Sequence, residues 1–152
     1  MALPAQIDTN GSWEDVQSRL YECFCNTFKR TPPLEVLNKR VVFDSRTIDS
    51  DLEEGFWHVV TKGKAEDRLF DPPRARRISW IEAILTSQPE GISRWSDVHS
   101  SGATRLYFWL ETENYVVVLQ ERKSVLSLVT AFYVEGWGAK DLKKSRARGT
   151  AF

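Results

Sequence analysis

The chain has 152 residues, of which 41% are hydrophobic, 12% aromatic and 28% charged. This length fits one domain with a continuous core, and the hydrophobic content excludes a disordered chain. No segment approaches the roughly 20 consecutive apolar residues of a membrane span, and the N-terminal residues lack the pattern of a secretory signal. We therefore expect a soluble, cytoplasmic protein with no membrane partner.

The net charge is zero, but the charged residues are unevenly distributed. Residues 1–57 hold ten acids and six bases, whereas residues 62–77 hold six bases and three acids. Residues 140–148 hold five more bases and one acid. We expect a single domain over residues 1–138, followed by a basic, flexible tail at 139–152.

Residues 13–30 are predicted to form a helix within a helical N-terminal segment, residues 1–40. Ser12 and Asp15 form a variant of the capping box, and apolar residues then recur at helical spacing. These apolar residues are Trp13, Val16, Leu20, Phe24 and Phe28. Thr31-Pro32-Pro33 ends the helix, because proline supplies no amide hydrogen and disfavours helix before it.

The middle of the chain is predicted to contain two short strands, a loop and a helix. The segments at 41–44 and 56–60 are rich in β-branched and aromatic residues, which favour strands. Residues 61–75 are rich in charge, glycine and proline, which is typical of a long exposed loop. Residues 75–87 have apolar residues at helical spacing and precede a Gln-Pro-Glu-Gly turn.

From Trp95 onward the pattern indicates four antiparallel strands. The segments WSDVH, TRLYFWLET, YVVVLQER and VLSLVTAFYVE are separated by short polar connections. The predicted fold class is therefore α+β, with N-terminal helices packed on a four-stranded antiparallel meander. In this arrangement the opposite face of the sheet is free for a functional site.

Chemistry without a metal or other cofactor is expected. The two cysteines and two histidines are too few and too scattered for a structural zinc site, and the acids form no compact group that would hold a metal pair. Gly-rich phosphate loops, nucleophile elbows and zinc-protease motifs are absent from the sequence.

His58 is the first candidate for a catalytic residue. It precedes Lys62, Lys64 and Arg68, and an imidazole beside several cations is the combination that acid/base cleavage of RNA requires. A satisfied structural histidine is the alternative. Lys62 and Arg68 are the corresponding phosphate-binding candidates.

Arg74 and Arg77 lie where the predicted loop becomes a helix. They are three residues apart and so face the same way on a helix, where free backbone amides and guanidinium groups can meet one anion. A solvated helix start is the alternative.

The predicted strands supply four further candidates. Thr130 and Tyr133 are further catalytic candidates, because their hydroxyl and phenol can orient a phosphate oxygen or share proton transfer, and a structural role is the alternative. They join one site only if a bulge intervenes, because they alternate in a regular strand. Tyr107 and Trp109, beside Arg105, can stack on unpaired bases of RNA. Core packing is the alternative for both aromatic residues.

Three segments together resemble the phage-associated branch of the barnase, EndoU, colicin and RelE-like RNase superfamily. They are FWHVVTKG, EDRLFDPPRARRISWIEAIL and RLYFWLETENYVVVLQERKSVLSLVTAFYVE, and the resemblance covers about residues 41–135. It implies a helix-plus-meander, RelE/barnase-like fold and a metal-independent endoribonuclease, often a toxin of a mobile element or bacterial conflict system.

The resemblance also implies roles for individual residues. His58 corresponds to the acid/base, Thr130 to the strand hydroxyl, and a set of basic residues to the phosphate-binding groups. This set comprises Lys62, Arg68, Arg74 and Arg77. Where such a motif often carries tyrosine after Thr-Ala, this chain has Phe132, followed by Tyr133.

The leading hypothesis is an endoribonuclease that forms a 2′,3′-cyclic phosphate. The alternative is a catalytically silent RNA- or protein-binding module that retains the fold, which Phe132 and the zero net charge favour. An inhibitory protein, such as an antitoxin or immunity protein, is an expected partner besides RNA. The acidic N-terminal segment is a candidate to cover the basic site in cis or to dock a basic partner.

Overall fold

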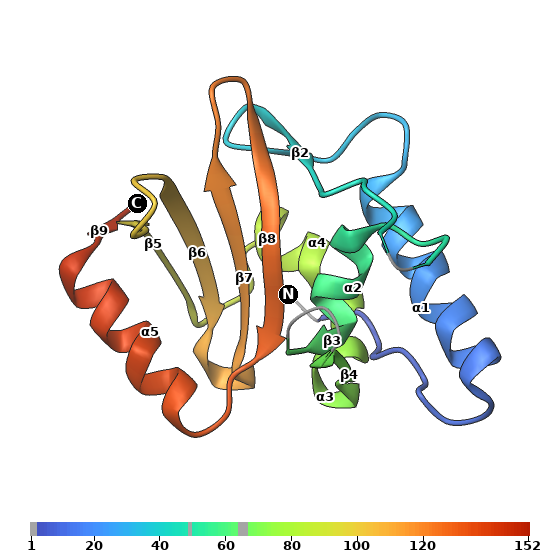
Figure 1. Ribbon diagram of the computed structural model, residues 1–152. Coiled ribbons are helices and arrows are strands. Elements are labelled where there is room, and N and C mark those ends of the chain that lie inside the picture. The colour runs from blue at the N-terminus through green and yellow to red at the C-terminus, as the bar shows by residue number, and fades with distance from the viewer. Residues whose placement is uncertain (1–2, 49, 64–66) are drawn as a thin grey trace.

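The computed structural model describes residues 3–48, 50–63 and 67–152. Within these ranges no helix combines the length and the apolar character needed to span a membrane. Figure 1 shows a central sheet with helix α5 (Trp137–Arg148) on one side and helices α1 (Trp13–Phe28) and α2 (Glu54–Val60) on the other.

Helix α1 confirms the predicted N-terminal helix. The hydroxyl of Ser12 accepts a hydrogen bond from the backbone amide of Asp15 at 3.2 Å, which caps the first turn. The buried residues of α1 include Val16, Leu20 and Phe24, so the predicted apolar stripe faces the core.

The sheet has seven strands in the order β1-β2-β8-β7-β6-β5-β9. The seven are β1 (Glu35–Val36), β2 (Lys39–Val42), β5 (Ile92–Val98), β6 (Thr104–Leu110), β7 (Tyr115–Glu121), β8 (Val125–Tyr133) and β9 (Thr150–Ala151). Strand β2 pairs in parallel with β8, and the other pairs are antiparallel. The α+β class is correct, but the prediction of a four-stranded antiparallel meander under N-terminal helices is wrong. The four predicted strands are present as β5 to β8 within a larger mixed sheet.

Both faces of this sheet carry a hydrophobic core. The first core joins the N-terminal helices to one face, through residues such as Leu106, Phe108 and Leu110 of β6. The second core lies between the other face and α5, and contains Trp95, Trp109, Val116, Val118, Val134 and Leu142. The expectation of an entirely free second face is therefore wrong.

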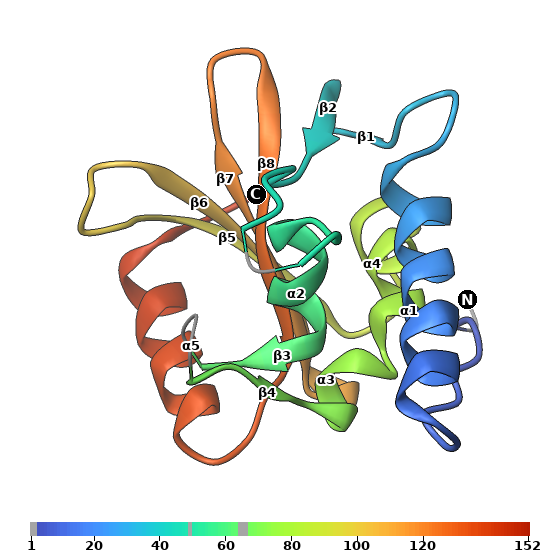
Figure 2. The same ribbon diagram turned by 45° about the vertical axis from the view of Figure 1, so that its right-hand side comes forward.

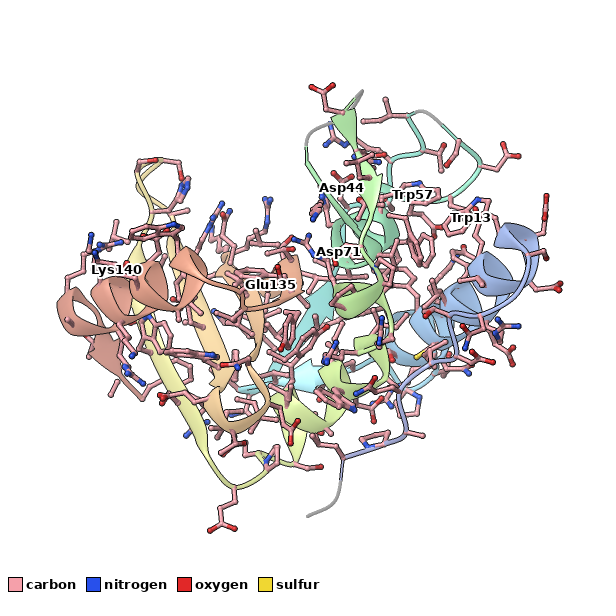
Figure 3. All side chains as sticks on the ribbon, turned by 90° about the horizontal axis from the view of Figure 1, so that it is seen from below. Trp13, Asp44, Trp57, Asp71, Glu135 and Lys140 are labelled. Carbon is pink, nitrogen blue, oxygen red and sulfur yellow. The ribbon has the colours of Figure 1, made fainter. Side chains whose placement is uncertain are left out.

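Residues 139–152, predicted as a flexible tail, lie mostly within helix α5 and strand β9. Leu142 of α5 is buried in the second core, and Trp95 Nε1 donates to Ser145 Oγ at 2.9 Å. A Cβ at Gly149 would lie 2.3 Å from the carbonyl oxygen of Ser96, so a glycine lets the chain turn against β5. The exposed basic residues of this segment are Lys140, Lys143, Lys144 and Arg148, whereas Arg146 is half-buried and its guanidinium carbon lies 5.2 Å from the ring centroid of Trp109. Figure 3 shows Lys140 of α5 and Trp13 of α1 at opposite ends of the molecule.

Residues 56–60, predicted as a strand, form the end of helix α2. Phe56, Val59 and Val60 are buried, and their spacing of three and four residues is helical. A five-residue run with four apolar residues fits either period. In the structure α2 packs against both the 43–44 segment and β8. Figure 2 shows α2 in front of β8.

The segment predicted as a loop and a single helix is more divided than expected. Strand β3 (Thr61–Lys62) pairs with β4 (Leu69–Phe70), and three helical pieces follow. These pieces are α3 (Pro72–Ala75), η2 (Ile78–Trp80) and α4 (Ile81–Thr86). A short 3-10 helix, η3 (Glu111–Glu113), connects β6 to β7.

Candidate functional site

A cleft of about 810 Å³ lies beside α2, between the 42–46 segment and one face of the sheet. Its volume falls within the range of cavities that hold small ligands, about 300–1,000 Å³. The side chains that line it are mainly polar or basic. They include Asp44, Arg46, His58, Thr61, Arg74, Arg105, Gln120, Arg122, Ser127 and Thr130.

His58 reaches this cleft from the last turn of α2, and its side chain is half-buried. Its carbonyl oxygen accepts hydrogen bonds from Thr130 Oγ1 at 3.0 Å and from Arg74 Nη1 at 3.2 Å. These donors satisfy a backbone carbonyl that the end of a helix leaves free. Burial lowers the pKa of the imidazole, so His58 is neutral at pH 7 and can accept a proton.

Arg74 lies in α3 and holds the end of α2 in place. Besides the carbonyl of His58, its guanidinium donates to the carbonyl of Thr61, and its Nε lies 3.4 Å from Asp71 Oδ2 in an ion pair. Burial lowers the pKa of this guanidinium. Arg74 therefore places a positive charge at the cleft and also has a structural role, which the sequence did not indicate.

Thr130 lies at an irregularity of β8, where the pairing shifts between Val118 and Leu119 of β7. Leu119 pairs with Leu128 and Val118 with Thr130, so one residue of β8 is unpaired, as in a β-bulge. This bulge precedes Thr130 and therefore does not bring Tyr133 to the same side. Tyr133 instead lies under the guanidinium of Arg77, whose carbon is 4.3 Å from the ring centroid.

The other predicted phosphate-binding residues do not line the cleft. Arg68 forms an ion pair with the buried carboxylate of Glu54 at 2.8 Å. Arg77 donates to the carbonyl of Pro73 and packs on aromatic rings. Lys62 is exposed on β3, between two residues that do line the cleft. Lys64 lies outside the described residues.

The predicted base-stacking residues belong to the second core. Trp109 is 2% exposed, and Tyr107 stacks on Trp95 with ring centroids 5.0 Å apart. Helix α5 covers this part of the sheet, which its basic sequence did not indicate. The core-packing alternative is therefore correct for Trp109.

Further arginines, which the sequence did not indicate as site residues, approach the cleft from the sheet and from the 42–46 segment. Arg105 lines the cleft from β6, and Arg122 lines it from the turn that follows β7. The guanidinium of Arg46 donates two hydrogen bonds to Asp44, at 2.9 and 2.6 Å, and these bonds lower the pKa of that carboxyl. The sequence offered one signal, the alternation of Arg105 with core residues in β6. This pattern does not show which part of that sheet face helix α5 leaves uncovered.

None of the described residues before Val42 lines the cleft. The acidic N-terminal segment therefore does not cover this site in the structure. Within the described ranges, no three His, Cys, Asp or Glu side chains lie close enough together to hold a metal ion.

Comparison of the chain with models of known protein families, with curated proteins and with solved structures found no match. The resemblance to the RNase superfamily therefore stays a prediction. The chemistry of the cleft residues is the basis on which a function is inferred.

Proposed function

We propose that the cleft binds a phosphodiester of RNA and that His58 promotes its cleavage without a metal ion. One observation carries the proposal. A half-buried imidazole with a lowered pKa lies in a cleft lined by four arginines, with Asp44 as the one carboxylate lining it among the described residues. Cations attract the phosphate, and a neutral imidazole takes up a proton.

In this mechanism the His58 imidazole removes the proton from a ribose 2′-hydroxyl. The 2′-oxygen then bonds to phosphorus, the bond to the 5′-oxygen breaks, and that oxygen takes a proton from solvent. The product is a 2′,3′-cyclic phosphate. Cleft arginines stabilise the charge that grows on the phosphate. Arg74 and Thr130 act as positioning residues, since both hold the backbone carbonyl of His58.

The test is cleavage of mixed RNA in excess chelator by the wild type and by His58→Ala. A general acid/base group supplies about 10²- to 10⁴-fold in rate, so the variant should cut slower by that factor and bind RNA normally. His99→Ala is the matched control, because His99 lies on the β5–β6 turn and bonds only locally with Ser101. Equal cutting by His58→Ala, or a need for added magnesium, contradicts the proposal. RNA binding without cutting by the wild type favours the silent binding module.

The resemblance extends this proposal to a toxin that an antitoxin or immunity protein holds inactive. Expression of the wild type in bacteria should then slow growth, and expression of His58→Ala should not. Equal tolerance of both proteins argues against a toxin.

A further inference from the structure

Arg105, Gln120 and Ser127 form a row of polar side chains across three neighbouring strands. Arg105 of β6 pairs with Gln120 of β7, which pairs with Ser127 of β8. Paired residues share a face of the sheet, and all three line the cleft. The row spans two inter-strand spacings, about 10 Å, and is separate from His58, which reaches the cleft from α2.

Arg105 lies opposite a carboxylate on the neighbouring strand but forms no ion pair with it. Asp97 of β5 is its direct partner across the strands. Asp97 Oδ2 instead accepts hydrogen bonds from Ser145 Oγ at 2.8 Å and from Arg148 Nε at 3.0 Å, both of α5. Helix α5 thus engages the carboxylate that would otherwise neutralise Arg105.

The guanidinium of Arg105 is left with unused donors. Its Nε is buried and has no hydrogen-bond partner, and no carboxylate in the described part of the chain forms an ion pair with it. An unpaired buried donor costs free energy, and a bound anion would remove that cost. Arg122, two residues after Gln120, adds a second positive charge to the cleft.

We propose that this row is a phosphate subsite, which holds a second phosphodiester of the RNA beside the one that His58 cleaves. The inference rests on the proposed function. A guanidinium, an amide and a hydroxyl can all donate to phosphate oxygens. The substrate is therefore an RNA chain with at least two phosphates, rather than a mononucleotide or a cyclic nucleotide.

The test compares a dinucleotide, which has one phosphodiester, with chains extended by one nucleotide on the 5′ or the 3′ side. Extension on one side should raise kcat/KM of the wild type by about tenfold or more, as expected for charge-assisted hydrogen bonds. Arg105→Gln should lose most of this gain, measured as the ratio of its kcat/KM on the longer chain to its kcat/KM on the dinucleotide. Arg94→Gln should keep the gain, because Arg94 of β5 packs on Phe152 outside the cleft.

Arg148→Gln gives a second variant in which Arg105 itself is unchanged. Without the ion pair to Arg148, Asp97 is free to neutralise Arg105, so this variant should also lose part of the gain from extension. The double variant Arg148→Gln with Asp97→Asn should recover it. A full gain in both Arg105→Gln and Arg148→Gln overturns the subsite.

The two proposals fail in different ways. If the wild type cuts the dinucleotide and the longer chains equally well, the subsite is wrong and the proposed function stands. If the wild type cuts no chain, the proposed function is wrong, and the affinity for an all-deoxy chain then decides on the subsite. The subsite is supported if Arg105→Gln binds more weakly than Arg94→Gln and the slope of log K against log salt concentration is smaller by about 0.7, for the lost phosphate contact. Equal binding by all variants overturns it.

Discussion

Among single residues, the proposed cleavage depends most on the charge state of His58. Burial lowers the pKa of its imidazole below the usual value of about 6.5. Glu54 and Asp44 raise this pKa, whereas Arg68 and Arg46 lower it. Burial has the largest effect, so the neutral form that accepts a proton is present at pH 7.

This shift predicts the pH dependence of cleavage. If His58 is the base, kcat/KM should rise with pH while the imidazole loses its proton, with the midpoint of the rise below pH 6.5. The test is a profile of kcat/KM from pH 4.5 to 8 for the wild type and for His58→Gln. The variant should lack the rising part of the profile. If kcat/KM rises over the same pH range in both proteins, His58 is not the base.

His58 and Arg74 were identifiable from the sequence as a titratable group and a cation, but Arg105 was not. An arginine that alternates with core residues in a strand is equally consistent with a solvated surface. Only the pairing of Asp97 with Arg148, which are 51 residues apart, leaves Arg105 unpaired. Long-range contacts of this kind leave no local pattern in the sequence.

At the scale of elements, the approach of α2 to the 43–44 segment brings His58 to the cleft. A Cβ at Gly55 would lie 2.8 Å from Phe43 Cβ and 3.2 Å from the backbone nitrogen of Asp44. The backbone of Gly55 also donates to the carbonyl of Asp44 at 2.8 Å, and Figure 3 shows Asp44 near Trp57, which belongs to α2. The glycine therefore permits this contact.

Gly55→Ala should separate α2 from the 43–44 segment. We expect a loss of about 1–3 kcal/mol in the free energy of unfolding, as for other overpacked sites, together with slower cleavage. Urea unfolding measures the first effect. The control is Gly138→Ala in α5, where the nearest atom to the new Cβ is Val134 Cγ1 at 3.5 Å, an ordinary contact. Equal stability of the two variants contradicts this account of α2.

The elements with long, regular patterns were predictable, and the short ones were not. Helix α1 and strands β5 to β8 carry sustained periodicity, so their sequence determines their class. Helix α2 ends in a run that is too short to distinguish the two periods. Helix α5 was misjudged because its mean composition is basic, although Leu142 and Ser145 are buried.

At the scale of the whole molecule, one sheet separates two cores, and α5 is as much a part of the fold as α1. Leu142 is 5% exposed in the second core. Leu142→Ala should lower the free energy of unfolding by about 2–5 kcal/mol, in a single transition seen alike by tryptophan fluorescence and far-UV circular dichroism. Lys143→Ala, on the exposed side of α5, should change it by less than about 0.5 kcal/mol. Two separate transitions contradict the picture of one cooperative domain.

Under the proposed function, the cleft cleaves RNA through the 2′-hydroxyl of its substrate. The most direct measurement uses DNA oligonucleotides that carry a single ribonucleotide, A, C, G or U, between randomised flanks, in excess chelator. The proposed function predicts cutting on the 3′ side of the ribonucleotide alone, a 2′,3′-cyclic phosphate at the new end, and no cutting of all-deoxy chains. Cutting at deoxyribonucleotides, or a new end with a free 3′-hydroxyl, contradicts it.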